Sequence, residues 1–300
     1  MSLPVDPLWP RAGNWPAPKG HSDFALIGVP TWRTSISPTN AGETPDAVRA
    51  MIPRYSEFSH AEHALEGGRP LSFSDCGNIA NPDEDEHRAL AEIAAVDAEL
   101  LVALGGDNAA TVPVALGRWG DRVATAGLVT VDAHYDLRDG VSNGSPVRRL
   151  IEAGLDGKRI VQIGISDFAN SAEYAARARD HGITVILRDE LLKRPMADIM
   201  AEALELAGSA GGPIHVDLDV DVCDRSVAPG CPASVPGGIS AHELRVAARV
   251  AGRHRLVESI DLVEVDATAD TDDARTIRLV ALCVLEAAAG LRERERRSGS

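Results

Sequence analysis

Two acidic clusters, each directly behind a short apolar run, place the strongest constraint on how this chain folds. The first, Asp-Ala-His-Tyr-Asp at residues 132–136, follows the apolar run at 126–131. The second, Asp-Leu-Asp-Val-Asp at residues 217–221, follows the run at 213–216. Both runs have the composition of buried strands. The acidic groups therefore stand where two strands of one sheet are expected to end.

Side chains on a strand alternate between its two faces, so every second residue of each cluster shares a face if the strand geometry continues. Carboxylates and an imidazole that converge in this way repel one another unless cations lie between them. Oxygen-rich sites with an imidazole suit Mn²⁺ and similar divalent ions. The clusters therefore predict a two-metal hydrolase site, whose converging groups are Asp132, His134, Asp136, Asp219 and Asp221.

The rest of the chain alternates between strand-like and helix-like segments. Apolar runs of strand length lie at residues 24–29, 71–74, 100–104, 127–131, 159–165, 183–187, 214–220 and 257–265. Helical spacing occurs at residues 84–99, 171–181, 196–207, 241–252 and 273–289. This alternation predicts a three-layer α/β/α fold with a mainly parallel sheet of about eight strands. Such sheets bind ligands at their carboxyl edge, where both acidic clusters are expected to lie.

No linker divides the chain, so we interpret residues 1–300 as a single α/β domain, with an irregular arm at 1–22 and a loose charged tail at 292–300. The net charge of −15 argues against partners such as nucleic acid or an anionic membrane. No run reaches the ~18 apolar residues that a membrane span needs. The four cysteines show no CxxC spacing, which fits reduced thiols in the cytoplasm. A cytoplasmic enzyme is therefore expected.

Four short motifs carry a resemblance to one enzyme family. They are Gly-Gly-Asp-Asn at 105–108, Asp-Ala-His-Tyr-Asp at 132–136, Asp-Val-Asp-Val-Cys-Asp-Arg-Ser-Val-Ala-Pro-Gly at 219–230, and Ser-Ile-Asp-Leu-Val-Glu-Val-Asp at 259–266. In order and spacing they resemble the motifs of the ureohydrolases, the family of arginase, agmatinase and formimidoylglutamase. The resemblance covers about residues 24–290 and favours the formimidoylglutamases. It also implies a homo-oligomer, a trimer or a hexamer.

The resemblance implies a site with two Mn²⁺ ions per chain. Asp132 and Asp219 would each bridge both ions, His134 and Asp221 would complete the shell of one ion, and Asp136 would bind the other. A water molecule between two cations loses a proton near neutral pH, which gives a hydroxide that can attack an amidine-type carbon. The implied reaction is hydrolysis of a non-peptide C–N bond in a linear formimino or guanidino substrate.

Two of the acids are expected to act on the substrate itself. Asp136 is adjacent to the bridging solvent in this scheme and is the predicted carrier of the proton that the departing nitrogen receives. Glu264 would hold the cationic nitrogens of the substrate, because a carboxylate matches their fork-like donor geometry.

Three residues depart from the family pattern or add to it. Asn108 stands where the family has a metal-binding histidine; an amide oxygen is neutral and usually a weaker donor than imidazole, so a site with one ion is also possible. Asp217 is an extra acid, either a hydrogen-bonded group behind the metal ligands or an unrelated buried acid. His215 is expected to be a core residue and not a ligand.

Substrate recognition is assigned to three positions. Arg138 is the first candidate for binding a substrate carboxylate, because formimidoylglutamases have a similar Asp-x-Arg segment and a guanidinium binds a carboxylate through two donors. Asn143 occupies the place where arginases and agmatinases usually have a histidine. Asp224, in the second acidic motif, is the third candidate. These assignments favour a formimidoylglutamase-like enzyme; residues 148–164, which also resemble agmatinases, leave an agmatinase-like enzyme that releases urea as the alternative.

Two readings of other classes remain. A family member that lost a metal could serve as a binding or regulatory subunit; Asn108 suggests this, whereas the intact ligands of both acidic clusters argue against it. A nucleotide-binding protein is disfavoured, because Gly105 and Gly106 lack the GxGxxG spacing and no P-loop lysine follows.

Overall fold

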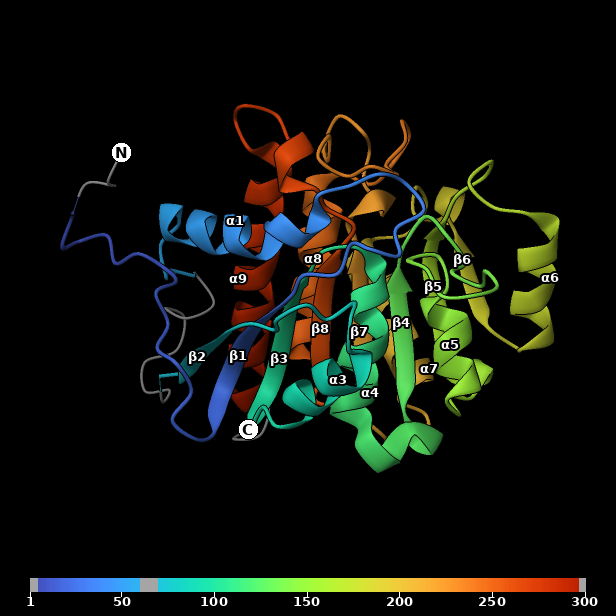
Figure 1. Ribbon diagram of the computed structural model, residues 1–300, viewed down its shortest axis with the longest axis horizontal. Coiled ribbons are helices and arrows are strands. Elements are labelled where there is room, and N and C mark those ends of the chain that lie inside the picture. The colour runs from blue at the N-terminus through green and yellow to red at the C-terminus, as the bar shows by residue number, and fades with distance from the viewer. Residues whose placement is uncertain (1–4, 60–69, 297–300) are drawn as a thin grey trace.

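The computed structural model of the protein describes residues 5–59 and 70–296. Within them, one eight-stranded sheet has the strand order β2-β1-β3-β8-β7-β4-β5-β6, and the paired strands are parallel (Figure 1). The strands are β1 (Ser22–Val29), β2 (Phe73–Asn78), β3 (Ala98–Gly105), β4 (Gly127–Val131), β5 (Ile160–Ile165), β6 (Thr184–Leu187), β7 (Ile214–Asp219) and β8 (Val257–Val263). The predicted parallel α/β sheet is confirmed.

Helices cover both faces of the sheet. They are α1 (Thr44–Met51), α3 (Glu86–Ala94), α4 (Thr111–Trp119), α5 (Pro146–Glu152), α6 (Ala172–Asp180), α7 (Met196–Ala207), α8 (Ala241–Arg253) and α9 (Arg275–Arg296). Helices α3, α4 and α5 pack in sequence on one face, and α7, α8 and α9 pack on the other, with α1 against α9 (Figure 1). The predicted three layers are therefore present. No helix of the described ranges is both long and apolar enough to pass through a bilayer.

The central strand β3 shows why the chain forms this layered core. Leu100, Val102 and Leu104 belong to the cluster beneath α7, α8 and α9, whereas Leu101 and Ala103 belong to the cluster beneath α3 and α4. Alternate side chains thus point to opposite faces, and a strand covered on both faces needs an almost continuous apolar run. Each fully buried leucine contributes about 1.5–3 kcal/mol relative to an exposed one.

Helix α4 was not predicted, because its sequence contains two residues that usually interrupt helices. Pro113 lies in the first turn, where its missing N–H has no partner to lose. Gly117 lies where α4 meets α3, and a Cβ atom at this position would be 2.7 Å from Ile93 Cγ2. Both residues therefore suit a helix that begins at a sheet edge and packs closely on its neighbour. The short helix α1 was also missed.

Some of the predicted segments have different bounds in the structure, including one helix and the C-terminal tail. The helix expected at 84–99 ends at residue 94, because β3 begins at residue 98. Residues 292–296 continue α9, where a loose tail was expected; the buried Arg294 donates to the carbonyl oxygens of Gly252 and Val257 and ties this end to the core. The arm at residues 5–21 is largely irregular, as expected. Residues 1–4 and 297–300 lie outside the described ranges.

Candidate metal centre

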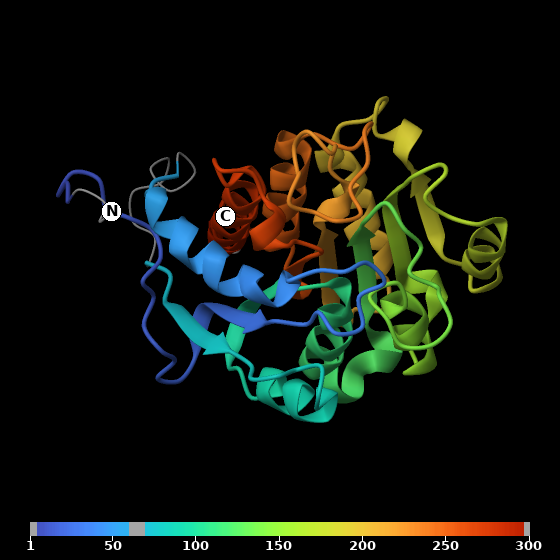
Figure 2. The ribbon, with the colours of Figure 1, turned by 45° about the horizontal axis from the view of Figure 1, so that its top comes forward.

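The candidate site lies at the carboxyl edge of the four neighbouring strands β3, β8, β7 and β4. Asn108 follows β3, Asp132 and His134 follow β4, Asp219 ends β7, and Glu264 follows β8. Figure 2 shows the loops after β1, β4 and β7 gathered over this edge. Parallel strands therefore bring together residues that are up to 156 positions apart in the chain, as the Asn108–Glu264 hydrogen bond shows.

The first acidic cluster is a loop and does not continue its strand. Strand β4 ends at Val131, and Asp136 has a left-handed φ of 52°. The loop is held by side-chain hydrogen bonds: Asn170 accepts from the backbone N–H of Tyr135 (3.0 Å) and donates to the carbonyl of Ala133 (2.8 Å). The acidic groups converge as predicted, but through this loop geometry and not through strand alternation.

Asp132, His134 and Asp221 form one compact group, with a possible ligand atom from each lying within 4.8 Å of the others. His134 Nδ1 is 2.7 Å from Asp221 Oδ2 and 3.5 Å from Asp132 Oδ1. Burial disfavours the charged imidazole, but these two carboxylates outweigh it and raise the pKa of His134 to about 12. His134 thus lies in direct contact with both acids of this group.

Two further carboxylates of the site have strongly raised pKa values. Burial, followed by the repulsion of Asp132, raises the pKa of Asp136; burial and Asp221 do the same for Asp219. Asp219 Oδ1 accepts the backbone N–H of Asp221 (2.8 Å), which sets the short 3₁₀ turn η7 (Val220–Val222) after β7. The sheet thus positions more acidic groups than the described protein cations can balance.

Both ends of the Asn108 side-chain amide are hydrogen-bonded in this structure. Its side-chain oxygen accepts a hydrogen bond from Thr111 Oγ1 (2.6 Å), and its side-chain nitrogen donates to Asp136. The amide therefore presents a hydrogen-bond donor to Asp136, and its role as a metal ligand stays a prediction. Thr111 was not anticipated from the sequence, although its position three residues after Asn108 is the spacing at which side chains meet at the start of a helix.

Glu264 is held from several sides. Its φ is 61°, and its backbone N–H donates to the carbonyl of Gly106 (2.9 Å). One carboxylate oxygen accepts from the backbone N–H of Asn108 (2.9 Å) and from Asn143 Nδ2 (2.7 Å). Burial and then the nearby Asp107 raise the pKa of Glu264 to about 8. Asn143 therefore orients Glu264, and its own side-chain oxygen is taken by the backbone N–H of Ile36 (3.0 Å).

A cavity of about 160 Å³ opens onto this centre. Its lining includes His134, Asp136, Asp219, Asp221, Glu264, Asn143, Arg138, Asn170 and Tyr174. The last two follow β5 and were not predicted, because no local motif marks them. Asp224 does not line the cavity: its two carboxylate oxygens accept hydrogen bonds from Ser226 and Gly237 within its own loop.

Arg138 is the exposed arginine of this lining, and its guanidinium makes no ion pair with the described residues. The side chain lies along Gly144, where an added Cβ atom would be 2.7 Å from Arg138 Cδ. Arg148 Nε donates to the carbonyl of Arg138 (2.6 Å) and so fixes the loop that carries it. The cavity thus combines a buried acidic centre with one unpaired cation.

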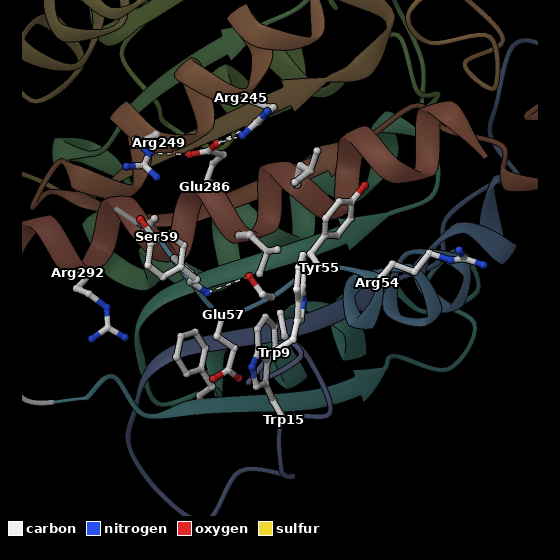
Figure 3. A pocket seen from close by; sticks show the side chains of 18 residues that line it. Trp9, Trp15, Arg54, Tyr55, Glu57, Ser59, Arg245, Arg249, Glu286 and Arg292 are labelled. Carbon is white, nitrogen blue, oxygen red and sulfur yellow. Dashed lines mark hydrogen bonds and ion pairs between the residues drawn. The ribbon is translucent and has the colours of Figure 1, made fainter. Parts of the chain in front are cut away.

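A larger cavity, of about 610 Å³, lies away from the sheet edge, between the N-terminal arm and α9 (Figure 3). Trp9, Trp15, Tyr55 and Phe73 are among its lining residues. Among its charged groups, Glu286 binds Arg245 and Arg249, each at 2.6 Å. This cavity contains none of the groups that could hold a metal among the described residues.

The chemistry of the acidic centre fits divalent cations. Asp132 Oδ2 is buried and accepts no hydrogen bond from the described residues, although a buried carboxylate oxygen is costly without a partner. The donor set of carboxylates and one imidazole suits Mn²⁺. The three-layer fold and this site together define a metal-dependent α/β hydrolase.

Comparison with known proteins gives the family. The arginase family model matches residues 22–290. Formimidoylglutamase of Halalkalibacterium halodurans is 35% identical over 260 residues, which cover 82% of this chain and 81% of that protein. The chain therefore belongs to the arginase family of hydrolases.

Two solved structures show the same fold. The crystal structure of formimidoylglutamase from Bacillus subtilis has a TM-score of 0.85 and 29% identity, and the match covers 97% of this chain and 94% of the other. Formiminoglutamase of Trypanosoma cruzi, solved with Mn²⁺, has a TM-score of 0.80 and 25% identity, with coverage of 91% and 94%.

Proposed function

We propose that this enzyme hydrolyses the C–N bond of a linear amidine that also carries a carboxylate, with N-formiminoglutamate as the substrate. The observation that carries the proposal is the unpaired guanidinium of Arg138 in the same cavity as the acidic centre. A guanidinium binds a carboxylate through two parallel hydrogen bonds, which gives both energy and orientation. The similarity to formimidoylglutamases from two bacteria supports this choice.

The proposed cofactor is Mn²⁺, with two ions per chain, and similarity to the Mn²⁺-containing T. cruzi structure supports it. Asp132, His134, Asp136, Asp219 and Asp221 would hold the ions. When bound, such ions lower the pKa of water, so that hydroxide is available near neutral pH. Their positive charge would also balance the surrounding carboxylates.

The residues of the chain supply orientation and proton transfer. Arg138 would bind the carboxylate end of the substrate, and Glu264 would accept hydrogen bonds from its cationic formimino nitrogens. Asn143 and the backbone N–H of Asn108 keep the Glu264 carboxylate in place. Asp136, whose pKa is raised by burial, is suited to take a proton from the attacking water and pass it to the departing nitrogen. The products are formamide and glutamate.

The test compares four substrates with the purified, Mn²⁺-loaded enzyme. N-formiminoglutamate should release formamide, and agmatine should release no urea. 4-Guanidinobutyrate has a carboxylate where agmatine has an amine, and 1-guanidinobutane has neither group. The proposal predicts that kcat/KM for formamide release from N-formiminoglutamate exceeds kcat/KM for urea release from each guanidino compound. The expected ratio is at least about 100-fold, which equals about 2.7 kcal/mol. Urea from agmatine without formamide from N-formiminoglutamate contradicts it.

Agmatine hydrolysis is the second candidate considered, and the charge of the cavity argues against it. Agmatine carries an amine at the end where formiminoglutamate carries carboxylates, and Arg138 would repel that amine. A binding or regulatory subunit without catalysis is also disfavoured, because both acidic clusters of the site converge. Assembly as a homo-oligomer and a cytoplasmic location stay predictions.

A further inference from the structure

The loop between β4 and α5 carries Arg138, the proposed contact for the carboxylate of the substrate. Residues 132–145 form this loop and contain neither a helix nor a strand. Within it, the backbone N–H of Arg138 donates to the carbonyl of Gly144 (3.0 Å). A flexible loop must be ordered when a ligand binds, and that ordering lowers the affinity. The contacts that hold residues 137–140 from outside the loop therefore bear on how well Arg138 binds.

Arg148, in the first turn of α5, is the first of two arginines that hold this segment. Its Nε donates to the carbonyl of Arg138 (2.6 Å), and its Nη2 donates to the carbonyl of Gly140. Its Nη1 pairs with Glu152, one turn further along α5. The carbonyls of the residues before and after Asp139 are thus fixed to one guanidinium, which is itself anchored on a helix.

Arg177, in α6, is the second of these arginines. Its Nη1 donates to the carbonyl of Leu137 (2.8 Å). Its two Nη atoms also donate to the two carboxylate oxygens of Asp139, at 2.7 and 3.0 Å. This is the parallel pairing that a guanidinium and a carboxylate favour. Residues 137–140 are therefore held by two arginines that come from two different helices.

The pair of Arg177 and Asp139 gives the protein little stability of its own. Helix α6 lies at the outer end of the sheet beside β6 (Figure 1), and Ala178 is the one residue of this helix that is buried. The two paired side chains are 37% and 79% exposed, and exposed ion pairs add little to the free energy of unfolding. A change in the position of Arg138, by contrast, directly affects how a carboxylate is bound, because two parallel hydrogen bonds need the correct geometry.

Neither Arg148 nor Arg177 belongs to the residues that line the cavity at the acidic centre, so neither contacts a substrate there. Each must act through a residue that does line it. Both hold the loop of Arg138, whereas Arg177 also lies over the ring of Tyr174, with its Cζ 5.5 Å from the ring centroid. The contacts common to both arginines therefore lead to Arg138.

We infer that Arg148 and Arg177 are positioning residues, which hold residues 137–140 so that Arg138 meets the carboxylate of the substrate with both of its donors. They thereby set the preference of the enzyme for amidines that carry a carboxylate. The inference rests on the proposed function for that carboxylate, but it does not depend on whether the amidine is a formimino or a guanidino group.

The first test measures KM and kcat of the Mn²⁺-loaded variants Arg177→Gln and Arg148→Gln with N-formiminoglutamate. Each variant should raise KM at least about fivefold, because a displaced guanidinium no longer matches the carboxylate, and should leave kcat within about twofold. The melting temperature of Arg177→Gln should fall by no more than about 2 °C, since its ion pair is exposed. An unchanged KM in either variant overturns the inference.

Arg159→Gln is the matched control. Arg159 directly precedes β5, at the amino edge of the sheet, and makes the same kinds of contact away from the cavity. It donates to the carbonyls of Ala126 (2.8 Å) and Ala124 (2.7 Å) and pairs with Asp156 (3.2 Å). Its replacement should leave KM unchanged. Equal increases of KM in Arg159→Gln and Arg177→Gln would reflect a general loosening of the fold and would contradict the inference.

The second test determines whether Arg177 acts through Arg138 or through Tyr174. Two residues that act through the same contact have effects that do not add. In an Arg138→Gln background, Arg177→Gln should therefore change KM by less than about twofold. An increase as large as in the original protein means that Arg177 acts by another route, such as Tyr174, and the inference is wrong.

Asp139→Asn decides the question if an arginine variant does not fold. The side chain of Asp139 is 79% exposed, so the fold should tolerate the change, which removes the charge that pairs with Arg177. KM should rise at least about twofold, because a neutral amide holds the guanidinium less firmly. A KM equal to that of the original protein counts against the positioning role.

The same measurements separate this inference from the proposed function. If the enzyme hydrolyses 4-guanidinobutyrate but not N-formiminoglutamate, the proposed substrate is wrong, and the KM comparison with 4-guanidinobutyrate decides the inference. If Arg138→Gln raises KM and Arg177→Gln does not, the proposed function stands and the inference fails. If Arg138→Gln itself leaves KM unchanged, both are refuted.

Discussion

The two cavities differ in size and, more informatively, in the charged groups that line them. The larger cavity, about 610 Å³ beside α9, has tryptophans and arginines in its lining, and Glu286 there is paired with Arg245 and Arg249. The cavity at the sheet edge is only about 160 Å³, yet its carboxylates outnumber the cations around them. The ion pairs of Glu286 are complete within the protein, whereas clustered buried acids must take up a proton or bind a cation. A cluster of buried carboxylates therefore identifies the functional cavity better than volume does.

The packing around the larger cavity supports this distinction. Trp15 stacks on Phe73 with ring centroids 5.0 Å apart, and it meets Phe24 edge-on at 5.5 Å. These contacts join the N-terminal arm to β1 and β2 and contribute about 0.5–1.5 kcal/mol per aromatic pair beyond burial. Changes in this region should therefore affect stability, and changes at the sheet edge should affect catalysis.

The largest effect is expected for Asp132→Asn, which keeps the shape of the side chain and removes its charge. Loss of this shared ligand should lower kcat/KM at least about 1000-fold, equal to about 4 kcal/mol. The measurement is steady-state formamide release. Glu286→Gln, in the larger cavity, is the control and should stay within about twofold. An active Asp132→Asn enzyme would remove the basis for a metal mechanism.

The next effect concerns stability. Mn²⁺ that binds only the folded protein should raise the free energy of unfolding by about 2.7 kcal/mol at a free concentration of 100 times Kd. Urea unfolding with and without Mn²⁺ measures this gain. The gain should remain in Glu286→Gln and disappear in Asp132→Asn. An equal gain in all three proteins would mean that the ion binds outside the acidic centre.

Arg138→Gln should affect substrate binding more than the chemical step. Loss of one charge-assisted contact should raise KM for N-formiminoglutamate about 10- to 100-fold, equal to about 1.4–2.7 kcal/mol, with kcat within a few-fold. Arg245→Gln removes an arginine from the larger cavity and should leave KM unchanged. If both variants behave alike, Arg138 does not contact the substrate.

The smallest effect, when taken over a single pH unit, is a pH dependence of the metal-free protein. The pKa of Glu264 is about 8 in the folded state and about 4.5 unfolded, so between these values the folded state holds a proton that the unfolded chain has released. Stability should therefore fall as pH rises from 4.5 to 8, by at most about 1.4 kcal/mol per pH unit.

Comparison with Glu264→Gln isolates this contribution in urea unfolding between pH 5 and 6. His134, with a folded pKa of about 12, changes stability in the same direction but only above its unfolded value of 6.5. The variant should show a flatter dependence than the original protein, whereas Glu286→Gln should not. Identical slopes in all three would mean that Glu264 ionises normally.

Much of the fold could be predicted because its strands carry local signals. The run 127–131 is β4 residue for residue, and the helix predicted at 196–207 is α7. The positions of Asp132 and Asp219 could also be predicted from the sequence, because acids at the ends of buried strands lie at the sheet edge. By contrast, α4 contains Pro113 and Gly117, which usually interrupt helices. Whether a helix tolerates them depends on where it begins and on what it packs against, and the local sequence shows neither.

The interactions inside the site could not be read from local sequence. The hydrogen bond from Thr111 turns the amide of Asn108, and only the structure shows that this oxygen is occupied. Similarly, the burial of Asp217 beside another acid depends on its register opposite Asp261, which belongs to β8. Contacts of this kind are set by which segments of the chain pack together, whereas a sequence motif describes only residues that are close in the sequence.

The left-handed backbone of Asp136 and Glu264 has a consequence for how this enzyme can change. Both residues adopt a conformation that glycine accepts readily and that costs other residues about 1–3 kcal/mol. Selection for heat resistance alone would therefore favour glycine at both positions and erase two acids of the site. Families that evolve toward stability without function should lose these carboxylates early, so their presence in a relative is a sign that activity is still under selection.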